Sequence, residues 1–332
     1  MQAILPLAGK GTRLRPLTHT RPKPLLRVGN RTVLDHVLEL LEEAGVDEIV
    51  GITGHLKDEI EAHLAAEHPD LRFTGVEQVE QLGTADAIRL AEHHVNGPVL
   101  IVFVDTLFEA DLALIGRRPE VDGIIWAKEV EDYQRFGVIV HDEDGYMERI
   151  VEKPSEPISR LANIGVYYIR DHEQLFEGIR HVMEQPPQLG EYFLTDAFQY
   201  MIDRGARILT AEVAEWWDCG KPETLLDTNA RVLAAGAATA AAVGEHVRVT
   251  GDVCVAPGVT LEDAEIGPNV SLASGTTVRR SKLRNCIVGS QSVLEDCDLR
   301  DSLVGDHVQA VGLRGVVHLG DHTMIRSEPG EG

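Results

Sequence analysis

The residues best suited to chemistry are basic side chains within a glycine-containing turn near the N-terminus. An apolar run that ends at Leu7 is followed by Ala8-Gly9-Lys10-Gly11-Thr12-Arg13. Small residues in such a turn let backbone N–H groups approach phosphate oxygens. Arg13 and, further along, Lys23 add positive charge, and prolines on both sides of Lys23 stiffen its segment. The segment therefore predicts a phosphate-binding loop.

Two common phosphate-binding motifs do not fit this turn. The pattern G-x-G-x-x-G of dinucleotide-binding folds is not satisfied, and Lys10 precedes Gly11 instead of following it as in a P-loop. Both interpretations are therefore disfavoured.

The continuation of the turn carries a longer pattern. Leu7 to Leu25 resembles the signature of the nucleotidylyltransferases that make nucleotide-sugars. The resemblance implies a nucleoside triphosphate and a sugar-1-phosphate as substrates. It also implies that Arg13 and Lys23 hold the phosphates and oppose the charge that develops on the leaving pyrophosphate. The nucleotide-binding residues implied in this way are Leu7, Ala8, Gly9, Gly11, Thr12, Arg13, Gln78, Gly83 and Thr84.

A second segment resembles the part of this family that recognises the base. Gln78 precedes Leu82-Gly83-Thr84-Ala85, where the family pairs a glutamine amide with a pyrimidine and completes the contact with a glycine backbone. An amide offers both a donor and an acceptor, which matches a pyrimidine-dione edge. The interpretation favours dTTP, with UTP second, and counts against GTP.

Two aspartates resemble the metal ligands of the family. Asp105 follows the apolar run Val99–Val104, and Asp218 lies in Trp216-Trp217-Asp218-Cys219-Gly220-Lys221-Pro222. Paired carboxylates with phosphate oxygens form a suitable shell for Mg²⁺, the implied cofactor. An aspartate at the end of a strand also serves as a turn former. Val104 and Lys221 depart from the family pattern, which usually has glycine and threonine there.

The sugar side is implied by further segments in the family's order. Arg135-Phe136-Gly137-Val138, Glu152-Lys153-Pro154 and Asn163-Ile164-Gly165 resemble its R-Y-G-V, E-K-P and N-x-G segments. Outside this context, Glu152 and Lys153 would be a solvated ion pair. The resemblance places Lys153 on the sugar phosphate and assigns it, with Arg13, Lys23 and Asp105, to catalysis. The implied sugar-phosphate-binding residues are Gly137, Glu152, Lys153, Asn163, Thr195 and Trp216.

The elements that position these residues alternate between strand and helix. β-Branched runs and amphipathic stretches predict an α/β domain with a Rossmann-like, mostly parallel sheet and ligands at the carboxyl ends of its strands. The predicted strands are 3–7, 48–52, 72–76, 99–104, 123–128, 137–141 and 165–169. The predicted helices are 33–44, 58–66, 85–92, 172–184 and 194–204.

The character of the chain changes after about residue 232. An Ala- and Gly-rich stretch leads into hexads headed by aliphatic residues, such as Val249, Val255 and Leu261. A six-residue period of this kind predicts a parallel β-helix of four to five coils, and an irregular β-sandwich fits it less well. Relatives with a C-terminal left-handed β-helix are common in the family. We therefore predict a nucleotidyltransferase domain at 1–232, a linker at 233–242 and a left-handed β-helix domain at 243–332.

Composition limits the partners and the location. The chain has 332 residues and a net charge of −23, from 54 acidic and 31 basic residues, which repels nucleic acid and anionic membranes. It shows neither a membrane-spanning run nor a signal peptide, so we expect a cytoplasmic protein. The four cysteines lack metal-ligand spacing and are expected to be small buried side chains.

The expected reaction converts glucose-1-phosphate and dTTP into a nucleotide-sugar and pyrophosphate. The sugar phosphate is already anionic and attacks the α-phosphate directly, so neither a covalent intermediate nor a histidine base is needed. Alternatives are a UTP-dependent transfer to glucose- or N-acetylglucosamine-1-phosphate, a GTP-dependent transfer to mannose-1-phosphate, and a regulatory subunit without catalysis. The β-helix is expected to support a homo-oligomer, since its flat sides suit self-association. Acetyl transfer by it is the other possibility, for which the candidate bases are His246, His307, His318 and His322.

Overall fold

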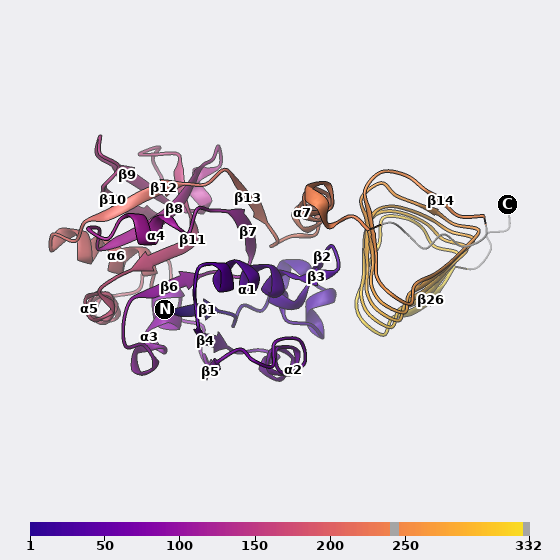
Figure 1. Cartoon of the computed structure of the whole chain (residues 1–332), viewed down its shortest axis with the longest axis horizontal. Coiled ribbons are helices and arrows are strands. Elements are labelled where there is room, and N and C mark those ends of the chain that lie inside the picture. The colour runs from indigo at the N-terminus through magenta and orange to yellow at the C-terminus, as the bar shows by residue number, and fades with distance from the viewer. Residues whose placement is uncertain (240–245, 328–332) are drawn as a thin grey trace. The chain divides into compact units, whose positions relative to one another are not determined.

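The computed structural model of the chain describes residues 1–239 and 246–327 (Figure 1). The chain forms two compact units that do not follow chain order. The first contains Met1–Gly9 and Val37–Trp216, and the second contains Lys10–His36 and Trp217–Gly332. The predicted division into sequential domains at 1–232 and 243–332 stays a prediction.

The first unit is built on one sheet, which confirms the predicted α/β class. Its strands run in the order β10-β9-β11-β6-β1-β4-β5, and β8 joins β12 to β11. β1 pairs in parallel with β4 and β6, as do β4 with β5 and β8 with β12. β11 runs antiparallel to β6, β8 and β9, and β9 to β10, so the sheet is mixed. The bounds are β1 (Gln2–Pro6), β4 (Glu48–Thr53), β5 (Phe73–Glu77), β6 (Val99–Val102), β8 (Gly123–Glu129), β9 (Gly137–His141), β10 (Met147–Glu152), β11 (Leu161–Ile169) and β12 (Ile208–Glu212).

Helices cover this sheet through their apolar faces. The helices α3 (Thr84–Arg89), α5 (His172–Met183) and α6 (Leu194–Asp203) pack against one another, and the core includes Ile88, Phe176 and Phe198. The side chain of Asp171 caps α5 by accepting from the N–H of Gln174. The remaining helices named in this region are α1 (Val33–Glu43), which continues across the boundary of the units, α2 (Lys57–Glu67) and α4 (Leu114–Arg117).

The predicted elements agree with these bounds to within a few residues. The sequence did not predict β10, whose residues Met147-Glu148-Arg149-Ile150 alternate too weakly, or β12. It also missed β7 (Thr106–Glu109), β13 (Glu215–Asp218) and α7 (Pro222–Val232). β7 starts one residue after Asp105, so that aspartate lies in a tight turn between two strands.

In the second unit, Lys10–His36 is compact despite having little regular structure. It contains the 3₁₀ turns η1 (Thr12–Leu14), η2 (Leu17–His19) and η3 (Lys23–Leu25), then the antiparallel pair β2 (Arg27–Val28) and β3 (Arg31–Thr32). Asn229 of α7 accepts from the N–H of Gly29 at 2.8 Å and from the hydroxyl of Ser271 at 2.7 Å. This buried amide links the segment to α7 and to the C-terminal strands.

The C-terminal strands form the predicted β-helix, whose coils are triangular in Figure 1. Partners in the ladder β16-β19-β21-β23-β26 are parallel and 15 to 17 residues apart, slightly less than three hexads. Aliphatic residues and Cys286 and Cys297 fill the core. The strands are β14 (Arg248–Val249), β15 (Val253–Val255), β16 (Thr260–Glu262), β17 (Glu265–Ile266), β18 (Val270–Leu272), β19 (Thr277–Arg279), β20 (Lys282–Val288), β21 (Val293–Glu295), β22 (Asp298–Val304), β23 (Gln309–Val311), β24 (Arg314–Gly315), β25 (His318–Leu319) and β26 (Met324–Arg326).

The predicted linker is only partly described. Its first residues form a short helical turn, η6 (Leu233–Ala237), directly after α7. The last predicted linker residues, 240–242, and the first residues predicted for the β-helix domain, 243–245, lie outside the described residues.

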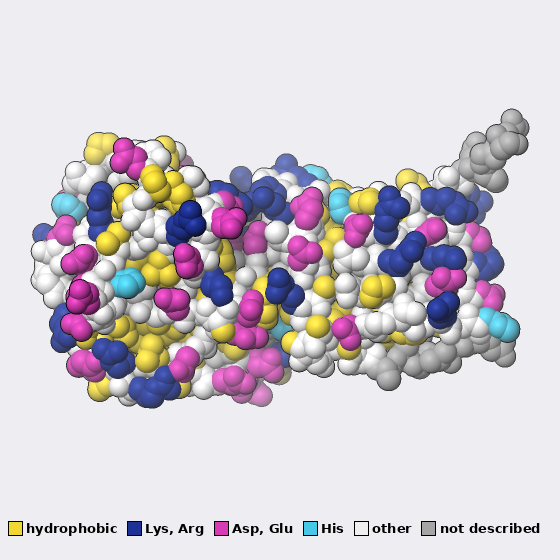
Figure 2. Space-filling view, turned by 90° about the horizontal axis from the view of Figure 1, so that it is seen from above, with side chains coloured by type: hydrophobic (Ala, Val, Ile, Leu, Met, Phe, Trp, Pro, Cys, Tyr) yellow, Lys and Arg dark blue, Asp and Glu magenta, His cyan; other side chains and the backbone are white. Residues whose placement is uncertain are grey.

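The described residues also bear on the expectations for surface charge and for the cysteines. Figure 2 shows acidic and basic side chains interspersed, with basic side chains gathered over the β-helix. There, Arg279 pairs with Glu262 and Lys282 with Glu265, each across neighbouring coils. All four cysteines are buried and free. Within the described residues, the helices are too short or too polar to span a bilayer.

Candidate active site

The side chains predicted to bind the triphosphate, Arg13 and Lys23, converge within the second unit. A Cβ placed on Gly220 would lie 3.0 Å from Nη2 of Arg13, 3.5 Å from Nζ of Lys23 and 2.7 Å from Oδ1 of Asp218. Two cations therefore face one carboxylate across the space left by a glycine. Asp218 is oriented by the N–H of Gly220 at 2.8 Å and the hydroxyl of Thr224 at 3.2 Å. The cluster can bind phosphate oxygens together with a cation.

The start of the signature segment lies in the first unit, at the end of β1. Leu7 and Ala8 are buried, and the N–H of Leu7 donates to the carbonyl of Ile52. Gly9 is exposed, with no atom within 4 Å of a Cβ built there. The amide of Gln81 donates to the carbonyl of Ala8 at 2.5 Å. Sequence reasoning missed Gln81, which is exposed and lies beside the predicted nucleotide loop.

Gln78 is held more tightly than the sequence suggested. Its side chain is 7% exposed, and Nε2 donates to Oδ2 of Asp86 at 3.0 Å. Asp86 in turn accepts two hydrogen bonds from Arg89. This chain fixes which end of the amide is the donor, so that Oε1 is the end left for a ligand N–H. Asp86 and Arg89 were not predicted from the sequence.

Gly83 is required by a neighbouring backbone. Its φ is +125°, and a Cβ would lie 2.4 Å from the carbonyl oxygen of Tyr192. The N–H of Tyr192 donates to Leu82, and Ala85 donates back to Tyr192. The hydroxyl of Thr84 accepts from the N–H of Leu194 at 2.9 Å. The segment predicted to recognise the base is therefore hydrogen-bonded to the segment that begins α6.

Four of the predicted sugar-binding residues form one cluster in the first unit. A Cβ on Gly137 would lie 2.3 Å from Nδ2 of Asn163, 2.8 Å from Oε2 of Glu152 and 2.9 Å from Cγ2 of Thr195. Asn163 donates to the carbonyl of Gly137 at 2.8 Å, and Thr195 donates to Glu152 at 3.3 Å. The cluster offers an amide, a carboxylate and a hydroxyl to a ligand with several hydroxyl groups.

The electrostatics of this cluster suit a binding site. Burial raises the pKa of the Glu152 carboxyl, while Lys153 and the hydroxyl of Thr195 act in the opposite direction. Tyr167 donates its phenolic hydrogen to Oδ1 of Asn163, and burial raises the pKa of that phenol. Tyr167 therefore holds the orientation of the Asn163 amide. Perturbed groups of this kind gather at functional sites.

Lys153 and Trp216 lie among aromatic rings. The ammonium of Lys153 is 4.8 Å from the ring centre of Phe193, a cation–π contact. Lys153 has a φ of +44°, and its N–H donates to the carbonyl of Phe136. Phe136 packs edge-on against Trp216, with ring centres 5.2 Å apart. The buried Nε1 of Trp216 finds no hydrogen-bond acceptor within residues 1–239 and 246–327.

Comparisons with known proteins identify the family. A family model described as Nucleotidyl transferase matches residues 2–235. The chain belongs to this family. The matched region includes every motif residue discussed above, and the match confirms the resemblance found in the sequence.

Curated relatives of this nucleotidyl transferase are themselves named as nucleotidyltransferases. It is 29% identical to a glucose-1-phosphate thymidylyltransferase of Streptomyces antibioticus, with 98% of this chain and 99% of that one covered. It is 35% identical to the low-salt glycan biosynthesis nucleotidyltransferase Agl11 of Haloferax volcanii, over 70% of this chain and 66% of that one. The protein is thus a sugar-1-phosphate nucleotidyltransferase.

A solved structure resembles most of the chain in its fold. A proposed glucose-1-phosphate thymidylyltransferase of Bacillus anthracis superposes with a TM-score of 0.61 at 26% identity, covering 70% of this chain and 94% of that one.

The predicted metal ligands of this nucleotidyl transferase fit Mg²⁺ by their chemistry. Asp105 and Asp218 are half-buried carboxylates, one in the turn after β6 and one at the end of β13. Carboxylate oxygens are the ligands that Mg²⁺ prefers, and it keeps several waters beside them. The donor set therefore suits this ion.

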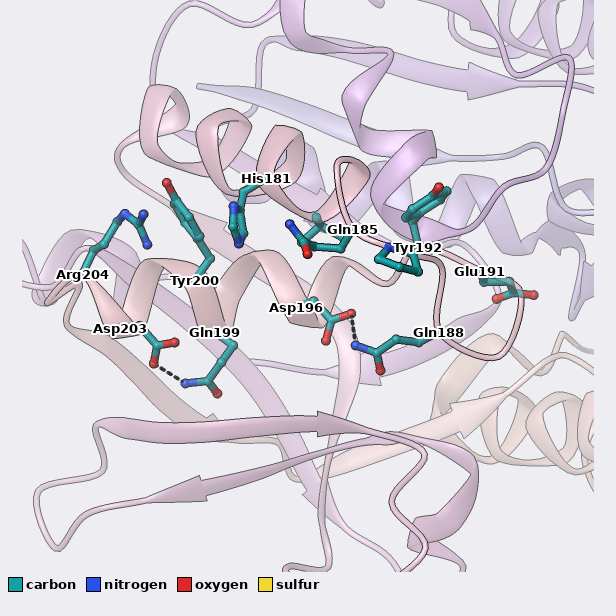
Figure 3. Close-up of a pocket in the computed structure, with 12 residues that line it drawn as sticks. His181, Gln185, Gln188, Glu191, Tyr192, Asp196, Gln199, Tyr200, Asp203 and Arg204 are labelled. Carbon is teal, nitrogen blue, oxygen red and sulfur yellow. Dashed lines mark hydrogen bonds between the residues drawn. The ribbon is translucent and has the colours of Figure 1, made fainter.

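A separate cavity of about 280 Å³ lies between α5 and α6 (Figure 3). Gln188 donates to Asp196 and Gln199 to Asp203 along its edge, and burial raises the pKa of Asp196. Among the described residues, those that line the cavity include none of the motif residues predicted from the sequence. Tyr192 and Asp196 connect it in sequence to the segment that contacts Gly83 and Glu152.

Proposed function

We propose that this nucleotidyltransferase converts glucose-1-phosphate and dTTP into dTDP-glucose and pyrophosphate, with UTP as the second choice of nucleotide. The observation that carries the sugar side of the proposal is the cluster of Gly137, Glu152, Asn163 and Thr195. Its polar groups converge on the space in front of a glycine, which suits recognition of sugar hydroxyls. The relatives named thymidylyltransferase support the choice of nucleotide.

In the proposed reaction a phosphate oxygen of the sugar-1-phosphate attacks the α-phosphorus of the triphosphate. A new P–O bond forms, the bond between the α-phosphorus and its bridging oxygen breaks, and pyrophosphate leaves with the electron pair. No proton transfer is required, because the attacking oxygen is already anionic. The protein's part is to bring two anions together and to oppose the charge on the leaving group.

The residues divide between the two substrates. Arg13 and Lys23 would neutralise the triphosphate, and their convergence at Gly220 supports this role. Lys153 would hold the phosphate of the sugar, since it adjoins Glu152 in sequence and lies over Phe193. Mg²⁺ held by Asp105 and Asp218 would supply further positive charge at the phosphates.

Base recognition is proposed for Gln78, with its donor end committed to Asp86. The remaining Oε1 would accept the N3–H of thymine or uracil. Adenine and cytosine have no ring N–H at the corresponding position, so both are disfavoured. A relative named UTP–glucose-1-phosphate uridylyltransferase AglF, from Haloferax volcanii, keeps UTP as the alternative. GTP-dependent transfer to mannose-1-phosphate is kept as a more remote alternative.

The test is a pyrophosphate-release assay over four nucleoside triphosphates and a set of sugar-1-phosphates, with and without a chelator. We expect the highest kcat/KM for dTTP with glucose-1-phosphate, and loss of turnover when Mg²⁺ is removed. A preference for GTP and mannose-1-phosphate would refute the substrate assignment. No turnover with any pair would favour a regulatory subunit.

We further propose that the protein acts in the cytoplasm as a homo-oligomer. The apolar side chains Met324 and Ile325 of β26 are exposed at the end of the described ladder, which supports self-association through the β-helix. Sedimentation of the purified chain tests the oligomeric state, and a monomer at micromolar concentration would refute the homo-oligomer.

A further inference from the structure

The segment between Arg13 and Lys23 is attached to the β-helix by polar contacts inside the second unit. Arg21 donates through Nη2 to Oδ2 of Asp306, and the same nitrogen lies 3.6 Å from Oδ2 of Asp321. The hydroxyl of Thr20 donates to Oδ2 of Asp321 at 3.0 Å. One arginine and one hydroxyl thus bind a pair of carboxylates that lie 285 and 301 residues further along the chain.

Both carboxylates are built into the β-helix by their other oxygen. Oδ1 of Asp306 accepts from the N–H of Ser290 at 2.8 Å, and Oδ1 of Asp321 accepts from the N–H of Asp306 at 2.7 Å. Each aspartate therefore ties its coil to the preceding one and turns its second oxygen toward Thr20 and Arg21. The regular coils fix the position of both carboxylates.

These charges are partly removed from water. The side chains of Arg21, Asp306 and Asp321 are 22%, 16% and 9% exposed. An ion pair at this depth is screened less by solvent than one on the open surface. Arg21 also offsets the repulsion between two carboxylates in neighbouring coils, so its position is strongly determined.

The attachment is transmitted to the predicted phosphate-binding side chains through short contacts. Pro16 packs on the β-helix, since a Cβ on Gly320 would lie 3.1 Å from its carbonyl oxygen. The hydroxyl of Thr18 donates to the carbonyl of Gly11 at 2.8 Å, which closes the turn that carries Arg13. Lys23 follows Arg21 by two residues, with Pro22 between them.

We propose that Arg21, Asp306 and Asp321 are positioning residues, through which the β-helix holds Arg13 and Lys23 in place for the nucleoside triphosphate. This rests on the proposed function, because it assigns the triphosphate to Arg13 and Lys23. The β-helix then contributes to nucleotide affinity through residues that do not touch the nucleotide.

The test is the double variant Asp306→Asn, Asp321→Asn. An asparagine keeps Oδ1 as an acceptor for the neighbouring coil but removes the negative charge that Arg21 binds. We expect the KM for the nucleotide to rise roughly tenfold, equivalent to about 1.4 kcal/mol. The KM for the sugar phosphate should stay within about twofold, because its predicted contacts belong to the first unit. A general loss of structure would move both constants.

The matched control is Asp296→Asn. Asp296 is an exposed aspartate of the same β-helix that pairs with Arg280 at 2.8 Å and has no contact with residues 10–36 among those described. This variant should keep both KM values. Equal nucleotide KM values for the control and the double variant would overturn the proposal.

Arg21→Gln, alone and combined with the double variant, separates positioning from direct binding. If Arg21 acts only through the two aspartates, Arg21→Gln, the double aspartate variant and the combination of both should have the same raised nucleotide KM. A further rise when Arg21→Gln is added would show that Arg21 itself binds phosphate, and would overturn the proposal. If wild type releases no pyrophosphate from any pair, the proposed function fails instead, so the two failures are distinct.

Discussion

Gly137 offers the sharpest test of the sugar side of the site. Its φ is outside the left-handed region, so Gly137→Ala leaves the backbone of β9 unstrained. The added methyl group would instead lie 2.3 Å from Asn163, 2.8 Å from Glu152 and 2.9 Å from Thr195. All three side chains must move outward to restore ordinary contacts.

The magnitude follows from the displacement. Relief of a 2.3 Å contact to an ordinary carbon–nitrogen separation moves the Asn163 amide by about 1 Å, and a misplacement of that size costs on the order of 100-fold in rate. We therefore expect kcat/KM for the sugar phosphate to fall about 100-fold, or about 2.7 kcal/mol. Overpacking should also lower the free energy of unfolding by about 1–3 kcal/mol.

The assay is pyrophosphate release, with each substrate varied at saturation of the other. The matched control is Gly97→Ala, since a Cβ on Gly97 meets no atom within 4 Å and its φ is also ordinary. The control should behave as wild type. If Gly137→Ala matches the control, or raises the nucleotide KM as much as the sugar-phosphate KM, the cluster does not bind the sugar.

Three further predictions concern other parts of the site. Because burial raises its pKa, the folded chain binds the Glu152 proton more tightly than the unfolded chain, so stability falls as pH rises through that pKa. Glu152→Gln should therefore raise the melting temperature at pH 7, measured by calorimetry, and a lower melting temperature would contradict this. The same variant should lower kcat/KM for the sugar phosphate, and the fall of kcat/KM at acid pH should disappear because no carboxylate remains to be protonated. Asp105→Asn should reduce kcat by about 100-fold or more without changing the melting temperature, because it weakens metal binding, and near-wild-type turnover with Mg²⁺ would remove Asp105 from the site. Gln78→Ala should bring the kcat/KM values for dTTP and CTP closer together, because Oε1 accepts a ring N–H that cytosine lacks, and an unchanged ratio would place base recognition elsewhere.

The sequence was most informative about elements and turns whose structure is determined by residues close together in the chain. The turn after Leu7 and the turn at Asp105 both follow strands of the sheet, where parallel strands expose their carboxyl ends. Alternation of strand and helix predicted most of the first unit for the same reason, since local periodicity determines which face each element buries. These parts depend on neighbours close in sequence.

The sequence was least informative where distant segments meet. Arg21 and Asp306 are 285 positions apart, and although Arg21 lies in the signature segment, nothing near either residue in the sequence indicates that the two side chains pair. The structure groups Lys10–His36 with the C-terminal coils in one compact unit, and no local pattern in the sequence indicates this grouping. Hydrophobic periodicity describes how each part folds but carries no information on which polar side chains will pair.

The sugar cluster is intermediate between these cases. Motifs indicated Gly137, Glu152 and Asn163 one at a time. The reason for the glycine appears only in the structure, where β10, β11 and α6 bring the side chains of Glu152, Asn163 and Thr195 around Gly137 of β9. Tyr167 shares the strand of Asn163 and orients its amide, yet its residue type is equally suited to a core. Its role was therefore not readable from the sequence.

The segment from Tyr192 to Thr195 connects the two regions predicted to recognise the base and the sugar. Its N-terminal end is bonded to the backbone of Leu82 and Ala85, and its C-terminal end donates a hydrogen bond to Glu152. A shift that suits a different base would therefore move the hydroxyl of Thr195 relative to Glu152. Under the proposed function, four consecutive residues would couple discrimination among bases to discrimination among sugars. A change at Gln78 alone should then blunt base selectivity without creating a new one. A change of base preference that leaves sugar selectivity intact would require compensating changes in the segment from Tyr192 to Thr195.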